Sequence, residues 1–327
     1  MSRCSFQSVR FVRAGGLSRG AVALAALWIC SADLARGQAV VPGSGRRLAQ
    51  GGDDFEDPKW KYTLNLPKSS EEQDKQVRMP GGFSSNNKWQ ESAKRGTPDL
   101  VKRVPPPEGG IPGSQGAMLM RTLNSMVPGA VSNTMGQDDL LFNLRSEYGG
   151  SIPVSATPSV VTHVYVPPFE DWEPRTGNSF GFRAGVRTTK TTPGRLFRPG
   201  ETKIEPYWPG IFIHFWPKGS DPRYKNGPSA MLLVRGDGLG HEMQGPRITE
   251  PGWWTLGMSF TPDGMVHYYA HAGVGKLTQK DLLVSTRPYS YNCEYFGTFF
   301  FDVINQDDGH SWSTPWVVDD SWVYVAR

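Results

Sequence analysis

The sequence predicts an all-β fold, a sandwich of two antiparallel sheets, from three observations. Glycine and proline together make up about a fifth of the 327 residues (38 Gly and 27 Pro), against roughly 12% in average proteins. From Gly116 onward, short runs rich in Val, Phe, Trp and Tyr are separated by turn residues, which is typical of strands. Several runs alternate apolar and polar residues, as strands with one buried face do.

We expect at least nine strands in this part of the chain. They are 117–122, 159–166, 179–187, 210–216, 230–235, 253–261, 265–271, 297–304 and 321–325. In the run 253–261, Leu256, Met258 and Phe260 share one face, and the runs 159–166 and 179–187 alternate in the same way. Two sheets that pack through such apolar faces form a sandwich. Pro262-Asp263-Gly264 predicts the tight turn of a hairpin.

Residues 1–39 have the three parts of a secretory signal peptide. Four arginines precede the apolar run 21–30, and small residues follow it at 30–32 and 37–39, which is the pattern of an export signal. The run is about half as long as a membrane span requires, so we expect cleavage after Ala32 or Ala39. We interpret the chain as an exported bacterial protein of the periplasm, cell surface or medium. No second long apolar run follows, so we expect no transmembrane span in the mature chain.

The remaining chain divides by composition into two parts. Residues 40–97 are rich in Gly, Pro and charged residues, which predicts a tether with little structure. Residues 98–327 contain the predicted strands and are the expected folded domain. Cys293 is the one cysteine outside the signal. No disulfide can therefore form within the mature chain, and the aromatic neighbours of Cys293 predict that its thiol is buried.

The charge balance argues against a nucleic-acid ligand. The formal net charge is +4, but five arginines and one aspartate lie in the signal, which leaves 30 basic and 30 acidic residues. Proteins that bind nucleic acid usually carry a strongly basic patch or domain. We therefore expect no nucleic-acid partner.

Two segments carry a resemblance to a known family. The segment 251–270, with Trp253-Trp254 before the Pro262-Asp263-Gly264 turn, resembles a hairpin of the concanavalin A-like lectin and glucanase superfamily. The segment 317–325 is similar to the closing strand of laminin-G-like jelly rolls. The resemblance covers about residues 98–327 and matches no subfamily motif. It implies a jelly-roll sandwich with saccharide ligands on the concave face or at its rim.

The motifs of the enzymes in this superfamily are missing. Retaining glycosidases of this fold carry a Glu-x-Asp-x-(x)-Glu strand, because their two carboxyl groups must lie about 5 Å apart, and no such strand exists here. The lyase motifs Arg-x-Glu-x-Arg and Gln-Ile-His are also absent. A lyase would instead need cationic and proton-transferring side chains on the concave face. The candidates are Arg183, His214, His163 and Tyr165, each of which has a structural role as its alternative.

Binding without catalysis requires fewer features. Aromatic rings stack on the apolar faces of sugars, and such side chains lie near Gly and Pro loops. The candidate ligand-binding residues are Tyr207, Trp208, Trp216, Arg183, Arg187 and His214. Trp208 is the strongest of these candidates because it lies in a loop.

Two groups of oxygen ligands could hold calcium, which prefers six to eight oxygens from clustered loops. The first group contains Asp302, Asn305, Asp307 and Asp308, and the second is Asp319-Asp320. Solvated turn carboxylates are the alternative, and no metal is required by the predicted function.

The sequence therefore favours an exported, non-catalytic carbohydrate-binding protein whose partner is a polysaccharide or a cell-surface glycan. Two alternatives stay open: a polysaccharide lyase, and a structural or protein-binding envelope domain.

Overall fold

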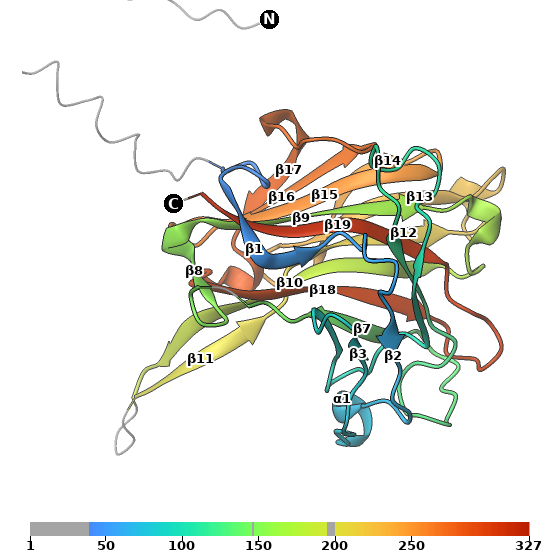
Figure 1. Ribbon diagram of the computed structural model, residues 1–327, viewed down its shortest axis with the longest axis horizontal. Helices are drawn as coiled ribbons and strands as arrows, with labels where there is room; N and C mark the ends of the chain where they lie inside the picture. Colours follow the sequence, from blue (N-terminus) through green and yellow to red (C-terminus); the bar gives the residue numbers. More distant parts are fainter. Residues whose placement is uncertain (1–38, 146, 195–199, 327) are drawn as a thin grey trace, which may run out of the picture. The chain divides into compact units, whose positions relative to one another are not determined.

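The computed structural model describes residues 39–145, 147–194 and 200–326. Their strands form two antiparallel sheets that pack face to face (Figure 1). The fold is thus the predicted all-β sandwich. The expected signal peptide, apart from Ala39, lies outside the described residues. Within them, no helix is long and apolar enough to cross a membrane.

The larger sheet has eleven strands in the described residues. In spatial order they are β14 (Glu242–Ile248), β13 (Ser229–Arg235), β12 (Gly210–Trp216), β10 (Gly177–Thr192), β18 (Tyr295–Asn305), β7 (Gly136–Phe142), β4 (Trp89–Glu91), β3 (Phe83–Ser84) and β2 (Tyr62–Thr63), with β11 (Glu201–Tyr207) beside β10 and β8 (Ile152–Pro153) beside β18.

The smaller sheet has eight strands within the described ranges. In spatial order they are β17 (Leu282–Thr286), β16 (Val266–Ala272), β15 (Gly252–Phe260), β9 (Pro158–Val166), β19 (Trp316–Val325), β6 (Ala117–Arg121) and β5 (Leu100–Val104), with β1 (Arg46–Asp53) also paired to β19. One short helix, α1 (Glu71–Asp74), and short 3-10 turns at 154–156, 169–171, 222–224, 279–281 and 288–290 complete the described elements.

All nine predicted strands are confirmed, because each coincides within a few residues with an observed strand. The predicted faces are confirmed as well: Leu256, Met258 and Phe260 are fully buried in the core between the sheets. Gly264 adopts a φ of +79° in the β15–β16 turn, a conformation that glycine adopts without strain. Cys293 is buried, as expected, and burial raises the pKa of its thiol to about 12.

The prediction of a tether over residues 40–97 is wrong. This segment supplies β1 to β4 and α1, and it belongs to the same compact unit as the rest of the described chain. Trp89 is fully buried and stacks between Phe55 and Phe301. Its indole N–H donates to the carboxylate of Asp53 at 2.9 Å. Some of its glycines lie within a strand, as Gly51 and Gly52 do in β1, and others in turns, as Gly96 does after β4, so the segment resembles a linker in composition alone.

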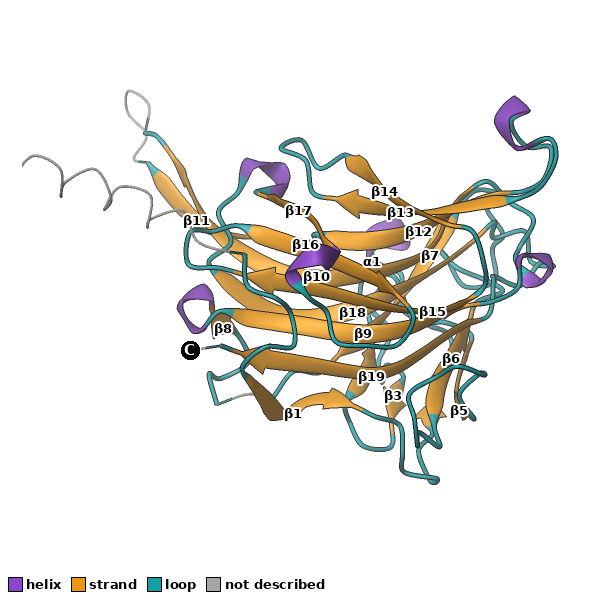
Figure 2. Ribbon diagram, turned by 90° about the horizontal axis from the view of Figure 1, so that it is seen from above, coloured by secondary structure: helices purple, strands orange, loops and turns teal. Residues whose placement is uncertain are grey.

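The outer face of the eight-stranded sheet is covered by other parts of the chain. The hydroxyl of Ser259 donates to the carbonyl of Val40 at 2.5 Å, and the indole N–H of Trp253 donates to the carbonyl of Pro107 at 3.3 Å. A Cβ added at Gly257 would lie 2.5 Å from the side chain of Leu277 and 2.8 Å from that of Pro42. Three segments therefore lie directly on this sheet: 39–45, 107–116 and 273–279. Figure 2 views the molecule with the outer face of this sheet toward the reader.

Candidate functional site

A cleft of about 740 Å³ lies on the outer face of the eleven-stranded sheet. Its floor consists of outward-facing side chains of β7, β10 and β18, because residues two apart in a strand share a face. Its walls come from the segment 71–95 and from the loop that precedes β12. We call it the main cleft; its lining residues are Glu71, Glu72, Lys75, Ser92, Ala93, Lys94, Arg95, Asp139, Leu141, Arg183, Gly185, Trp208, Thr298 and Phe300.

Arg183 is anchored at one side of the floor. Its guanidinium donates to the carbonyl of Trp208 at 2.9 Å and to the Asp302 carboxylate at 3.3 Å, and it is 6% exposed. Gly210 lies opposite Arg183 in the neighbouring strand β12. A Cβ there would lie 2.5 Å from the Arg183 side chain. The glycine thus leaves room for the arginine to lie along the sheet and hold the Trp208 loop.

Asp139 and Asp302 lie directly opposite each other on β7 and β18. Asp302 is fully buried, whereas Asp139 lines the main cleft. Burial raises the pKa of Asp302 well above its ordinary value, although the positive charge of Arg183 opposes that shift. Asp302 therefore keeps its proton at a higher pH than an exposed aspartate does. The side-chain amide of Gln137 donates to Asp139 at 2.6 Å and fixes its orientation.

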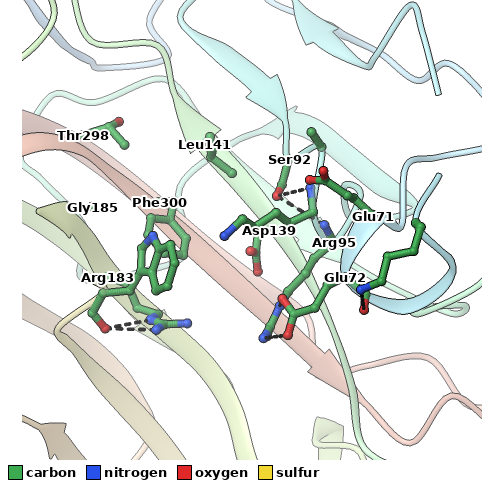
Figure 3. A pocket seen from close by; sticks show the side chains of 14 residues that line it. Glu71, Glu72, Ser92, Arg95, Asp139, Leu141, Arg183, Gly185, Thr298 and Phe300 are labelled. Atoms are coloured by element: carbon green, nitrogen blue, oxygen red, sulfur yellow. Dashed lines mark hydrogen bonds and ion pairs between the residues drawn. The ribbon is translucent and has the colours of Figure 1, made fainter. Parts of the chain in front are cut away.

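Arg95 and Glu72 form the opposite wall. The guanidinium donates from two nitrogens to the two carboxylate oxygens, at 2.8 and 2.6 Å. These hydrogen bonds lower the pKa of Glu72. Such a two-point pair is geometrically specific, so it fixes the α1 segment to the segment that carries Arg95. Figure 3 shows Arg95 and Arg183 on opposite sides of Asp139.

Trp208 is partly exposed at the rim of the main cleft. The ammonium group of Lys94 lies 4.3 Å from the centre of its indole ring, a cation–π contact. Among the described residues, no carboxylate forms an ion pair with Lys94 within 4.0 Å. The main cleft thus combines an aromatic ring, a cation near it, and a floor that includes Phe300.

The structure separates the other predicted aromatic ligands from this cleft. Tyr207 was expected to contact ligand, but it is 3% exposed and packs in the core against the rings of Tyr289 and Tyr291. Successive side chains in an extended chain point to opposite faces. Because Trp208 faces the cleft, Tyr207 before it points into the core. Trp216 lies on the same outer face at the end of β12, where it packs on His214 and Tyr224.

Two more candidates on this sheet lie outside the main cleft. Arg187 is exposed on β10, beyond the irregularity in strand pairing between Gly185 and Val186. His214 is partly buried, and its Nδ1 lies 2.8 Å from the amide oxygen of Asn178. Burial lowers the pKa of His214. Neither residue lines the main cleft.

The structure does not bring together the four residues that the lyase alternative would need, Arg183, His214, His163 and Tyr165. His163 and Tyr165 belong to β9, which lies in the eight-stranded sheet, whereas Arg183 and His214 lie in the other sheet. Both β9 residues are on the covered outer face, where Tyr165 packs against Trp253. Alternation along a strand assigns each residue to a face, but it does not say to which of the two sheets the strand belongs.

The proposed calcium ligands have hydrogen-bond or ion-pair partners within the chain, and Asn305 and Asp307 both bond Ser125. Asp302 pairs with Arg183, and Asp308 accepts hydrogen bonds from the backbone of His310 and Ser311. Asp307 accepts from the backbone of Ser125 and Ser132, and Asn305 donates to the carbonyl of Leu123. In the second group, Asp319 accepts from Ser114. Over the ranges that the structure describes, no three His, Cys, Asp or Glu side chains are arranged to hold a metal ion.

Sequence reasoning missed most of the cleft. Glu72, Lys94 and Arg95 lie in the segment interpreted as a tether, and Asp139 lies in a strand that was not predicted. Phe300 and Asp302 lie in the predicted strand 297–304, two residues apart and therefore on one face. The available signal was the even spacing of Thr298 and Asp302, the strand's polar side chains, which share that face with Phe300.

No protein-family model matches the chain, and no curated protein matches it by sequence. Solved structures with a similar fold include a GH131 beta-glucanase catalytic domain from Podospora anserina (12% identity, 75% of this chain and 89% of that one, TM-score 0.41). An alginate lyase from Pseudomonas aeruginosa (10%, 69% and 86%, 0.36) and peanut lectin (10%, 68% and 96%, 0.34) are similar too.

Proposed function

We propose that the main cleft binds a carbohydrate chain, a polysaccharide or a cell-surface glycan, without catalysis. One observation carries this proposal: the cleft places the ring of Trp208 and the ring of Phe300 among hydrogen-bonding groups of Asp139, Arg95 and Ser92. A sugar ring presents apolar C–H faces and polar hydroxyls, so it needs both kinds of surface together.

The contents of the cleft favour binding over the lyase alternative. None of the described residues that line it is a histidine or a tyrosine, the side chains that would remove and return protons in that reaction. Glu72 is held by Arg95, and Asp302 is buried against Arg183. These two acidic groups therefore have structural partners in the wall and beneath the floor.

The proposed setting follows from the N-terminal pattern of residues 1–39. We propose export to the periplasm, cell surface or medium, where polysaccharides and surface glycans are available as ligands. Calcium stays a possible accessory, which a binding measurement can test directly.

A polysaccharide and glycan array with the purified chain tests the proposal, with calcium and then with a chelator. The unaltered protein is expected to bind at least one glycan without producing absorbance near 235 nm, the signal of an unsaturated lyase product. Trp208→Ala is expected to weaken binding about tenfold, which corresponds to about 1.4 kcal/mol.

The matched control is Trp312→Ala. Trp312 is 37% exposed and contacts Arg121 outside the cleft, so its replacement should leave binding unchanged. Equal losses in both variants would contradict the assignment to the cleft. Rising absorbance would favour a lyase, and an array with no binding would favour the structural or protein-binding alternative.

A further inference from the structure

A smaller hollow of about 280 Å³ lies on the same outer face of the eleven-stranded sheet. Arg95 lines both this hollow and the main cleft, so the two meet at its side chain. The smaller hollow also receives Gln137 from β7, Phe212 from β12 and Ile304 from β18. Met126 and Met135 add apolar surface to it.

The same strands run from the main cleft into the smaller hollow. On β18, Thr298 and Phe300 line the main cleft, and Ile304 lines the hollow. On β7, Leu141 lines the first and Gln137 the second. Because residues two apart share a face, these side chains form continuous rows. Thr298 and Ile304 are six residues apart, about 20 Å in a strand, which is longer than a single sugar ring.

Between the two spaces the floor is closed, because Gly181 and Asp302 are both buried. Gly181 lies opposite Asp302 in the neighbouring strand, and a Cβ there would lie 2.8 Å from the carboxylate and 2.9 Å from the ring of Phe212. The glycine therefore keeps the middle of the floor free of a further side chain. Arg95, tied to Glu72, lines both spaces, and Figure 3 shows it beside Asp139.

The two spaces differ in charge. The main cleft is rich in charged groups of both signs: its described lining includes the cations Lys75, Lys94, Arg95 and Arg183 and the carboxylates Glu71, Glu72 and Asp139. In the smaller hollow the further cation is Arg235, which Glu242 neutralises at 2.7 Å. Its remaining lining is apolar or uncharged, with side-chain amides of Gln73, Gln137 and Asn178. Apolar surface with amide groups suits an uncharged sugar ring.

We propose that the smaller hollow is a second subsite, for an uncharged sugar unit of the same chain that contacts Trp208. This inference rests on the proposed function and deepens it: the ligand is an extended chain that lies along the strands and passes Arg95. Met135 borders this subsite and is 54% exposed, so it can be replaced without disturbing the core.

The test uses native affinity gels with laminarin, glucomannan, xylan, pectin and alginate, followed by an oligosaccharide ladder of whichever polysaccharide the full chain binds. We expect affinity to rise at least tenfold from the disaccharide to the hexasaccharide. Met135→Trp fills the hollow, so it should abolish that gain and leave the disaccharide affinity unchanged. Met135→Ala should reduce the gain less. Val131→Trp is the matched control, because Val131 is 50% exposed and lines neither space.

The outcomes distinguish the failure of the second subsite from the failure of the proposed function. If Met135→Trp and Met135→Ala both keep the full rise in affinity from the disaccharide to the hexasaccharide, the second subsite is overturned. If Trp208→Ala still weakens binding in that case, the proposed function stands. The absence of a chain-length gain in the unaltered protein also overturns the second subsite. If none of the five polysaccharides binds the unaltered protein, the proposed function and this inference both fall.

Discussion

On the outer face of the eight-stranded sheet, His163, Tyr165 and Trp253 lie beneath other segments of the chain, whereas on the opposite outer face Arg183 and Asp139 border an open cleft. In both sheets, outward-facing residues alternate with core residues along each strand, and the outward-facing side chains are similar in polarity and aromatic content. The two faces differ in how much of each is covered by other segments of the chain. The segment 39–97 contributes to both, since residues near Val40 lie on one sheet and residues near Arg95 stand as a wall on the other.

The comparison teaches that a site on a sandwich is defined by what the loops leave uncovered. Strand residues such as Arg183 and Tyr165 are equivalent in pattern, yet one lines a cleft and the other packs under a tryptophan. If the segment 39–97 were a tether, neither the cover nor the wall would be fixed. The predictions below test this role, from the largest expected effect to the smallest.

The largest effect is expected for Trp89→Ala. Trp89 anchors the segment 39–97 to the core through Phe55, Phe142, Phe299 and Phe301. Loss of a fully buried tryptophan typically lowers the free energy of unfolding by about 3–5 kcal/mol, and urea unfolding measures this change. A loss below about 1 kcal/mol, like that expected of an exposed residue, would show that the segment is separate from the core.

The second prediction concerns pH and the covered face. Burial raises the pKa of Asp319 to about 7, and the negative charges of Asp320 and Glu56 act in the same direction. The pKa in the unfolded chain is about 3.9. Between these values the folded state binds the proton more tightly, so this carboxyl lowers stability progressively as pH rises from about 4 to 7.

Asp319→Asn keeps the shape and removes the titration. Its advantage over the unaltered protein should be near zero at pH 4 and grow by on the order of 1 kcal/mol per pH unit up to pH 7. Urea unfolding at pH 4.5, 6 and 7.5 measures the difference. Parallel pH dependences in the two proteins would mean that Asp319 titrates normally, and hence that the segment carrying Ser114 does not seal it from water.

The third prediction compares one glycine from each face. Gly257→Ala places a Cβ against Leu277 and Pro42, at 2.5 and 2.8 Å, so we expect a loss of about 1–3 kcal/mol from overpacking. Gly185→Ala on the open face meets Thr298 at 3.3 Å and should change stability by no more than about 0.5 kcal/mol. Thermal unfolding of the pair measures both. Similar losses at the two positions would contradict the distinction between a covered and an open face.

The sequence was sufficient for the sandwich but not for the cleft. Long alternating strands such as 253–261 carry their own signal, because burial of one face imposes a period of two. The short strands β2, β3 and β4 have two or three residues each, too few for any period. Arg95 and Glu72 form the wall of the cleft through hydrogen bonds between residues 23 positions apart in the chain. No local sequence pattern predicts such a contact. The exposure of Trp208 could be predicted, because the prolines and the glycine beside it indicate a loop.

The pairing of β1 with β19 has a mechanical consequence. Arg46, where β1 begins, lies beside Val325, where β19 ends. Tension applied between these two points would pull perpendicular to the strands. It would break the β1–β19 hydrogen bonds one after another from that end, whereas shear along the strands would load all of them at once. A sandwich pulled in the perpendicular direction would yield first along β1, and β1 would separate from β19 before the wall that carries Arg95 is loaded.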